Sequence, residues 1–370
     1  MRVLVDYRPA LRERSGVGEY VHQFVRALLK AFSKPDLDLS LISSSWKDRL
    51  VPSSEIEGAT IVDRRLPGKL LNLAWHRLGW PPAEVLAGRP FDVTHSLHPL
   101  LMPTSRAAQV VTIHDLDFLV HPERTRAEIR RDYPTLVCEH ARRADGIVVI
   151  SESTGRAVER EFGVPPERIT VCTPGAPPWQ PRPQAPADGY ILFIGTLEPR
   201  KNVGGLLDAY EQLLARRHDM PRLVLAGKAT EEAKPWLERI ARAPLSGHVE
   251  HIGYVEAPDR RAVYEGARLL VQPSFDEGFG IPVLEAMTLG VPVVASDRGA
   301  LPEVLGDAGP LVDPATDGAL ASAIERLVDD GAFAATCASK GVERSRKFSW
   351  DAMARGVFAA YQRAIERRCA

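Results

Sequence analysis

Two carboxylates, Glu277 and Glu285, are the side chains of this sequence best spaced to do chemistry together. Gly278 and Gly280 lie between them and would let backbone N–H groups approach a ligand closely. A carboxylate accepts hydrogen bonds from vicinal hydroxyls, such as those of a hexose or a ribose. The pattern therefore favours a sugar nucleotide as ligand. The alternative is a solvated loop residue followed by an acid on a helix surface.

The elements around these glutamates are a strand, a loop and a helix. The apolar run at residues 267–271 predicts a buried strand. Pro282 suits the first turn of a helix that would end near Gly290. Glu277 then lies on the loop and Glu285 on the first turns of the helix. In an open α/β sheet such a junction faces the ligand crevice, and a helix N-terminus there favours a diphosphate.

Two adjacent cations, Arg200 and Lys201, follow another apolar run and precede a predicted helix at residues 202–214. Arginine can hold phosphate oxygens through two hydrogen bonds, and lysine supplies a point charge. Cations fixed beside a leaving diphosphate stabilise the charge that grows there as a glycosyl bond breaks. An exposed Arg-Lys turn is the alternative, and Asn202 can cap the helix in either case.

A glycine pair, Gly16 and Gly18, separates the predicted strand at residues 2–6 from a helix at residues 20–31. The third glycine of the dinucleotide-binding motif is replaced by Val21, which weakens a nicotinamide-binding interpretation. The alternative to a ligand-binding loop is a simple turn from strand to helix.

Polar residues follow other predicted strands. His114 follows the strand at residues 109–113 and should face the crevice. Asp115 and Asp117 imitate the Asp-x-Asp motif of metal-dependent transferases, and we interpret the likeness as coincidental. Ser151 follows a later strand and either contacts a ligand or caps a helix.

Signals for a second substrate are weaker. His95 and His98 lie near the end of a predicted strand at residues 91–95 and are candidates to line the binding site of this second substrate. Residues 69–80 combine leucines, two tryptophans and cations, the composition of a helix at a membrane interface. We favour an ordinary core-facing helix there, and peripheral membrane contact stays open. A second basic cluster comprises Arg124, Arg126, Arg130 and Arg131.

Strands and helices alternate twice along the chain, around a proline-rich stretch. Six prolines within residues 173–186 predict a semi-rigid linker. Both alternations are typical of doubly wound parallel sheets. The predicted domains are residues 1–172 and 188–348, with a linker at residues 173–187 and a final helix at residues 349–370. The predicted strands are residues 2–6, 37–43, 60–62, 91–95, 109–113, 146–150, 190–194, 222–226, 249–252, 269–272 and 292–295.

Composition fits a globular protein of two domains. The chain has 370 residues, 45% of them hydrophobic and 26% charged, and a net charge of −1, so no attraction to nucleic acid follows. Its four cysteines form no Cys-x-x-Cys pair, which points to free thiols in a reducing compartment and to no zinc site. The charged start resembles no signal peptide, and no apolar run is long enough to span a bilayer. We expect a cytoplasmic protein, with the inner face of the plasma membrane as a possible site of contact.

Four motifs together resemble the retaining glycosyltransferases of family 4, which have the GT-B fold. Residues 277–287, Glu-Gly-Phe-Gly-Ile-Pro-Val-Leu-Glu-Ala-Met, resemble the family signature. Residues 15–20 resemble its glycine loop, residues 112–116 its histidine motif and residues 195–202 its diphosphate-binding motif. They occur in the family's order and cover nearly the whole chain. The likeness is greatest to the mannosyltransferases that build bacterial surface polysaccharides.

The resemblance implies two Rossmann-like domains facing a central cleft, with the last helix crossing back to the first domain. It implies transfer of a hexose, best guessed as mannose from GDP-mannose, to a glycan or lipid-linked glycan, without a metal. Arg200 and Lys201 would hold the diphosphate, Glu277 and His114 the sugar, and Glu285 the ribose. The other implied donor contacts are Gly16, Gly18, Phe279, Gly280, Ile281, Tyr254 and Val255.

Other functions remain open on the same fold. A donor based on UDP is the nearest alternative, followed by a phosphorylase or a sugar-nucleotide epimerase. A non-catalytic subunit that binds a nucleotide sugar is an alternative of another class, but the four charges at positions 200, 201, 277 and 285 argue against it. An NAD-dependent dehydrogenase is disfavoured by the incomplete glycine motif.

Overall fold

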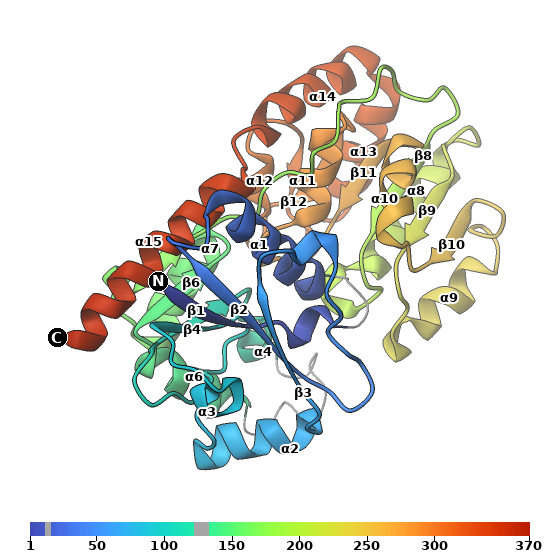
Figure 1. The fold of residues 1–370 in the computed structure, drawn as a ribbon. Coiled ribbons are helices and arrows are strands. Elements are labelled where there is room, and N and C mark those ends of the chain that lie inside the picture. Colours follow the sequence, from blue (N-terminus) through green and yellow to red (C-terminus); the bar gives the residue numbers. More distant parts are fainter. Residues whose placement is uncertain (12–15, 122–132) are drawn as a thin grey trace. The chain divides into compact units, whose positions relative to one another are not determined.

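The structure is a computed structural model that describes residues 1–11, 16–121 and 133–370, and they form two compact units (Figure 1). The first unit comprises Met1–Gly175 and Ser349–Ala370, and the second comprises Ala176–Phe348. Each unit is built on one parallel sheet. The predicted α/β class with two doubly wound sheets is therefore confirmed.

The first unit holds a seven-stranded sheet in the order β3-β2-β1-β4-β5-β6-β7. Its strands are β1 Arg2–Asp6, β2 Asp38–Ser44, β3 Thr60–Arg64, β4 Val93–Ser96, β5 Ala108–Ile113, β6 Gly146–Val149 and β7 Ile169–Val171. Its α-helices are α1 Val17–Ala31, α2 Gly68–Leu73, α3 Ala83–Ala87, α4 Asp117–Val120, α6 Tyr133–Arg143, α7 Glu152–Phe162 and α15 Trp350–Cys369. The strand order reverses between β1 and β4, which is the point where doubly wound sheets open a ligand crevice.

The last helix of the chain packs in this first unit. Helix α15 lies against α1, β5 and β6 (Figure 1). Phe358 on α15 stacks on Phe32 just after α1, with ring centroids 4.3 Å apart. The hydroxyl of Tyr361, also on α15, is 2.7 Å from Nδ1 of His95 on β4. The sequence of residues 349–370 thus completes a core that residues 1–175 begin.

The second unit holds a six-stranded sheet in the order β10-β9-β8-β11-β12-β13. Its strands are β8 Tyr190–Ile194, β9 Leu223–Ala226, β10 Val249–Gly253, β11 Ala267–Gln272, β12 Val293–Ser296 and β13 Leu311–Val312. Its α-helices are α8 Val203–Arg216, α9 Lys234–Ile240, α10 Ala257–Glu265, α11 Ile281–Thr288, α12 Leu301–Leu305, α13 Ala319–Asp329 and α14 Gly331–Ser345. Here the order reverses between β8 and β11.

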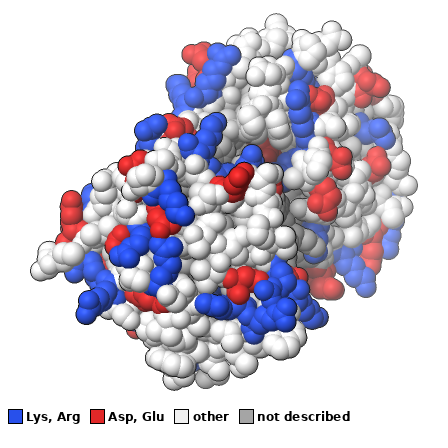
Figure 2. Space-filling model, in the orientation of Figure 1, with Lys and Arg blue, Asp and Glu red and all other residues white. Residues whose placement is uncertain are grey.

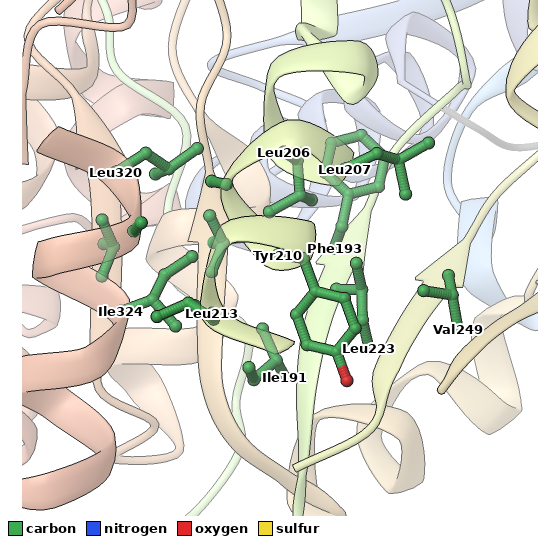
Figure 3. Close-up of a cluster of buried hydrophobic side chains, with 14 of the residues drawn as sticks. Ile191, Phe193, Leu206, Leu207, Tyr210, Leu213, Leu223, Val249, Leu320 and Ile324 are labelled. Atoms are coloured by element: carbon green, nitrogen blue, oxygen red, sulfur yellow. The ribbon is translucent and has the colours of Figure 1, made fainter. Parts of the chain in front are cut away.

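Apolar packing fixes the end of β8 in the second unit. Figure 3 shows Ile191 and Phe193 of β8 beneath the side chains of α8. Leu206, Tyr210 and Leu213 of α8 are fully buried, at the spacing that places them on one helical face. Since β8 and α8 are locked together, the short segment between them, which carries Arg200 and Lys201, has little freedom.

The strands and helices expected from the apolar runs are present, with ends shifted by a few residues. Two strands were not predicted, β7 and β13, and both are very short. Residues 173–187 contain no helix or strand, and Arg182 within them donates to the carbonyls of Glu265 (3.2 Å) and Ala267 in the second unit. Helix α6 is described from Tyr133 onward, and residues 122–132 lie outside the described part.

Candidate functional site

The candidate site of the second unit lies where its strand order reverses. Residues 195–202 follow β8, and residues 273–280 follow β11. These are the carboxyl ends of two neighbouring parallel strands, so their loops meet at one edge of the sheet. The structure thereby brings together the two segments that the sequence singled out separately.

Glu277 is the centre of this site and is buried. Nζ of Lys201 lies 2.6 Å from its Oε1 and 2.7 Å from its Oε2, and Nη1 of Arg200 lies 3.5 Å from Oε2. Oε1 also accepts from Nε2 of Gln272 (2.8 Å) and from Oγ of Ser274 (2.7 Å). Burial alone would raise the pKa of Glu277, but the charges of Lys201 and Arg200 lower it to about 2. The carboxylate is therefore ionised at neutral pH.

The two oxygens of Glu277 differ in what they can still bind. Oε1 already accepts from three donors, whereas Oε2 contacts the two cations, Lys201 and Arg200. A ligand hydroxyl would therefore meet Oε2, beside Lys201 and Arg200. Arg200 is itself anchored by the carbonyl of Asp276 (3.0 Å) and by Glu198 (3.0 Å). The arrangement can hold an anion and a hydroxyl side by side.

Asn202 ties the two loops of the site together. It adopts a left-handed backbone conformation with φ of 54° and caps α8, because its Oδ1 accepts from the N–H of Gly205 (3.2 Å). Its Nδ2 donates to the carbonyl of Pro273 in the loop after β11 (3.2 Å). A side chain at Gly205 would place its Cβ 2.5 Å from Oδ1 of Asn202, so only glycine fits there. The predicted capping role of Asn202 is confirmed.

Helix α11 begins inside the site. Its N-cap, Gly280, has φ of 102°, and a Cβ there would lie 2.7 Å from Cδ2 of Leu301, so the position requires glycine. The first N–H groups of a helix lack partners within it, so those near Ile281 suit an anion. The ring of Phe279 is buried against Phe348, 5.6 Å between centroids, and leaves only the backbone of Phe279 for a ligand.

Glu285 lies further along α11 and is also buried. Its Oε1 accepts from Nη1 of Arg260 (3.0 Å), and its Oε2 accepts from the hydroxyl of Tyr264 (2.8 Å). Both partners lie on α10, which begins shortly after the half-buried Tyr254 and Val255. The residues predicted to bind a nucleoside are thus linked through α10.

The remaining predicted residues belong to the first unit. His114 follows β5, and its Nε2–H donates to the carbonyl of Leu97 (3.1 Å), which leaves Nδ1 as an acceptor. Burial lowers the pKa of His114, so its ring is neutral. Tyr20 of α1 meets this ring edge-on at 4.9 Å. Gly16, with φ of 53°, is the N-cap of α1, and Gly18 is buried in its first turn. Ser15 lies outside the described residues.

Two residues that the sequence offered as candidates for ligand contact, Ser151 and His95, are fully buried in the structure. Ser151 is fully buried, and its Oγ accepts from the N–H of Thr154 (3.0 Å) and donates to Thr154 Oγ1 (2.9 Å), so it caps α7 instead of meeting a ligand. His95 lies within β4 and is also fully buried, between Tyr361 and Oγ1 of Thr112 (2.8 Å). His95 is therefore a core residue and forms no wall of a binding site.

One polar network at the strand reversal of the first unit was missed. Asp6, at the end of β1, is fully buried and accepts from Nε of Arg8 at 2.9 and 3.0 Å. Nε2–H of His98, after β4, donates to Asp6 (3.0 Å), while Nδ1 of His98 accepts from the N–H of Leu100 (3.2 Å). Burial opposes ionisation of Asp6, but Arg8 and His98 hold its pKa well below the usual range. An aspartate ending the first strand of such a sheet was the available signal.

Asp115 and Asp117 lie just before and at the start of α4. Asp115 accepts from the N–H of Asp117 (3.3 Å) at the start of α4. Across residues 1–11, 16–121 and 133–370, the structure contains no group of three or more His, Cys, Asp or Glu side chains that could hold a metal ion.

The chain matches two family models, Glycosyltransferase Family 4 over residues 14–179 and Glycosyl transferases group 1 over residues 180–344. It is 30% identical over 307 residues to the MMP alpha-(1->4)-mannosyltransferase of Mycolicibacterium hassiacum, covering 77% of this chain and 74% of that protein. The chain belongs to the family 4 glycosyltransferases. The resemblance predicted from the four motifs is confirmed, and this glycosyltransferase works on a nucleotide-sugar donor and a glycan acceptor.

Two further likenesses span the whole chain. This glycosyltransferase is 29% identical over 383 residues to the O-antigen chain mannosyltransferase B of Escherichia coli, covering 98% of this chain and 100% of that one. Its fold is similar to the sucrose-phosphate synthase of Thermosynechococcus elongatus, with a TM-score of 0.78, 21% sequence identity and 98% of each chain covered. The second likeness supports the GT-B fold alone.

Proposed function

We propose that this glycosyltransferase moves mannose from GDP-mannose to a hydroxyl of a glycan or lipid-linked glycan, with retention of the anomeric configuration. The observation that carries the proposal is the buried contact of Glu277 with Lys201 and Arg200 at the strand reversal of the second unit. The choice of mannose rests on the full-length likeness to a protein named as an O-antigen mannosyltransferase. The choice of GDP follows from that sugar.

The proposed chemistry is mainly electrostatic. Arg200 and Lys201 would hold the β-phosphate and stabilise the charge that grows on it as the bond to the sugar breaks. The backbone N–H groups of Phe279, Gly280 and Ile281 would add donors at the start of α11. None of these groups must reorganise during the reaction, because Glu277 and Asn202 already hold the cations and their loop in place.

The sugar and nucleoside would be oriented by separate groups. Oε2 of Glu277 would accept from a sugar hydroxyl, and Nδ1 of the neutral His114 would accept from another. Glu285 would accept from the ribose hydroxyls, with Tyr254 and Val255 near the base. Gly16 and Gly18 would approach the donor diphosphate from α1. We propose that the reaction needs no metal, because Lys201 and Arg200 supply the positive charge that a metal otherwise gives.

The test is a transfer assay with purified protein, GDP-mannose and UDP-glucose as rival donors, and an oligomannose acceptor. The proposal expects product from GDP-mannose in the presence of EDTA, with the new linkage in the same anomeric configuration as the donor. If only UDP-glucose gave product, the proposed donor would be UDP-glucose instead of GDP-mannose. Release of GDP only when inorganic phosphate is added would indicate a phosphorylase.

We also propose that the first unit makes a peripheral contact with a bilayer that carries the acceptor. Helix α2 and the π-helical turn Ala74–Leu78 bury Leu71 and Trp75 but leave Leu70, Leu73 and Leu78 exposed by 63%, 57% and 74%. An ordinary core-facing helix would turn polar side chains to water instead.

The surroundings of this leucine face suit an anionic membrane. Trp80 is 65% exposed, and Arg64, Arg65 and Arg77 are exposed nearby in the sequence. Figure 2 shows a group of Lys and Arg side chains bordering an uncharged surface over α2. Exposed leucine and tryptophan beside arginine are the composition of an interfacial segment. The second basic cluster, Arg124, Arg126, Arg130 and Arg131, lies outside the described residues. None of the helices in the described part of the chain has both the length and the apolar character needed to cross a bilayer.

Co-sedimentation with vesicles tests the contact. The protein should pellet with vesicles containing phosphatidylglycerol and much less with pure phosphatidylcholine, and binding should weaken at high salt. Replacing Leu70, Leu73 and Leu78 by serine should abolish pelleting while transfer to a soluble acceptor persists. Ile252→Ser, at an exposed site of the second unit, is the control. Unchanged pelleting of the triple variant would refute this contact surface.

A further inference from the structure

The carboxylate of Glu277 is oriented by two uncharged side chains as well as by the cations. Gln272 is the last residue of β11, and its Nε2 donates to Oε1 of Glu277 (2.8 Å). Ser274, two residues later, donates from its Oγ to the same oxygen (2.7 Å). Gln272 and Ser274 are both fully buried. Together with Lys201 they saturate Oε1, so they fix the plane of the carboxylate and the direction of Oε2.

The amide of Gln272 is turned by the charge of its partner. An ionised carboxylate accepts hydrogen bonds and cannot donate them, so the NH₂ group of Gln272 must face Glu277. The same Nε2 also donates to Oγ of Ser274 (3.1 Å). The carbonyl oxygen of Gln272 is left buried, with no hydrogen-bond partner among the residues that the structure describes. Because a buried unpaired carbonyl lowers stability, an apolar side chain would serve the fold better at this position.

The main chain of this loop is held from the neighbouring strand β12. Oγ of Ser296, at the end of β12, donates to the carbonyl of Ser274 (2.5 Å). The N–H of Ala300 donates to the carbonyl of Glu277 (2.9 Å). Gly299 has φ of 58°, and a Cβ there would lie 2.5 Å from the carbonyl oxygen of Glu277. With its backbone fixed in this way, Glu277 depends on the donors to its Oε1 for the direction of its side chain.

We propose that Gln272 is a positioning residue for the donor sugar, acting through Glu277, and that Ser274 shares this role. The two hold Oε1 of Glu277 and thereby present Oε2 to a sugar hydroxyl beside the cations. This inference rests on the proposed function, in which Glu277 binds the sugar of a nucleotide sugar. The buried amide of Gln272 thus serves the reaction, and its unpaired carbonyl is a local loss of stability that the sugar site requires.

This role has consequences that a purely structural role lacks. Lys201 stays paired with Glu277 when Gln272 is replaced, so recognition of the diphosphate should persist. Transfer of the sugar should slow, because Glu277 loses a donor that fixes its direction. That loss should disappear in an enzyme that already lacks the Glu277 carboxylate. A residue that merely supported the fold would slow both enzymes alike.

The experiment is a double-mutant cycle between positions 272 and 277, measured as kcat/KM of transfer. The donor is GDP-mannose or UDP-glucose, whichever the unmodified enzyme uses. Gln272→Met keeps the length of the side chain but removes the amide. It should lower kcat/KM by about tenfold, the usual effect of losing one hydrogen bond to a charged group. In the Glu277→Ala background the same substitution should change kcat/KM by less than about twofold.

Binding and stability measurements accompany the cycle. The Kd of the matching nucleoside diphosphate, measured by calorimetry, should stay within about twofold in Gln272→Met, since the diphosphate meets the cations and the start of α11. The melting temperature should stay within about 4 °C, because the substitution also removes the unpaired carbonyl.

Two further variants complete the test. Gln109→Met is the matched control, because Gln109 is a buried glutamine of β5 in the first unit. Its Nε2 donates to the carbonyl of Met102 (2.6 Å), and its replacement should leave kcat/KM within about twofold. Ser274→Ala removes the other uncharged donor and should lower kcat/KM severalfold, which keeps the test available if Gln272→Met does not fold.

Each outcome bears on a different statement. An unchanged kcat/KM in Gln272→Met, or a loss of equal size with and without the Glu277 carboxylate, would overturn the positioning role. A parallel loss of nucleoside diphosphate binding would overturn it as well, because the whole site would then be damaged. Transfer from neither donor by the unmodified enzyme would instead overturn the proposed function.

Discussion

Both units place an ion pair where their strand order reverses, but the two pairs are built differently. In the first unit, Asp6 ends β1 and Arg8 follows it two residues later, and His98 joins them from the segment after β4. In the second unit, Glu277 after β11 meets Lys201 and Arg200 after β8. The first pair is formed by two residues close together in the sequence at the end of β1, whereas the second bridges the ends of two strands.

Because of this difference, the strand reversals of the two units suit different ligands. In the second unit, two cations face one carboxylate across the junction, so an incoming anion can share them. In the first unit, one arginine balances one aspartate, and the nearby ring of His114 is neutral because burial lowers its pKa. A neutral, hydrogen-bonding surface suits a sugar hydroxyl better than a phosphate. The comparison therefore supports the proposal that the second unit holds the charged part of the donor.

The largest effect is expected from Lys201→Met, which removes a cation from the bridging pair. Turnover should fall by about 10²–10³-fold, the usual result of losing one group that stabilises a developing charge. Affinity for the free nucleoside diphosphate should fall as well. Lys340→Met is the matched control, because Lys340 forms an exposed pair with Asp307 (2.8 Å), and it should leave kcat unchanged. Turnover of Lys201→Met near that of the unmodified enzyme would remove Lys201 from the mechanism.

A smaller and more selective effect is expected from Glu277→Gln. The substitution keeps the shape of the side chain but frees Lys201 and Arg200 from a negative charge, so free GDP should bind at least as tightly as before. Transfer should still fall by about 10- to 100-fold, since the sugar loses a charged acceptor. Steady-state kinetics measures transfer, and calorimetry on the same sample measures the binding of GDP. Parallel loss of GDP binding and transfer would contradict the separation of roles.

Acid should destabilise the first unit before the second. Burial lowers the pKa of His95 to about 3 and lowers the pKa of His76 and of His140 to about 4, all below the ordinary 6.5. Below pH 6.5 these histidines bind protons in the unfolded chain, whereas their buried rings stay neutral in the folded protein. Each ring then costs about 1.4 kcal/mol of stability per pH unit until its folded pKa is reached. Glu277, with a pKa of about 2, contributes its full stabilisation above pH 4.5 and loses it only in stronger acid.

Hydrogen exchange at pH 7.5 and pH 5.0 measures this contrast, after correction for intrinsic exchange rates. Protection of β4 and β5 should fall much more than protection of β8 and β11. Equal losses in both sheets would contradict the account, and His95→Gln should reduce the loss in the first unit.

The smallest effect is expected at Asp115. Asp115→Asn should change transfer by less than about twofold, and EDTA should leave activity in place, because the proposed mechanism takes its positive charge from Lys201 and Arg200. If EDTA abolished activity and magnesium restored it, the reaction would need a metal, and the comparison between the two units would lack an essential component. Assays with and without each divalent cation decide the point.

The segment around Glu277 could be predicted from sequence because its parts are contiguous. An apolar run, a glycine loop and Pro282 specify strand, turn and helix locally. The partners of Glu285 could not be predicted, since sequence does not say which face of α10 turns inward. Arg260 and Arg261 are adjacent, yet Arg260 is largely buried against Glu285 and Arg261 is exposed.

Small shifts at strand ends explain the other misses. The predicted strand at residues 91–95 ends at Ser96 in the structure, so His95 lies inside β4 and its side chain faces the core. Strand ends are the least certain part of such predictions, and one residue reverses the direction of a side chain. Strands β7 and β13 escaped detection because three and two residues are too few for any periodic pattern.

The most direct test of the central claim is calorimetric titration of the enzyme with GDP, UDP and ADP in EDTA, repeated with Lys201→Met. The account predicts that one nucleoside diphosphate, GDP, binds selectively without metal, and that Lys201→Met weakens this binding by at least about tenfold. Tighter binding of UDP would change the donor but keep the site. No binding of any nucleotide, or equal binding by Lys201→Met, would contradict the claim that the reversal between β8 and β11 holds the donor diphosphate.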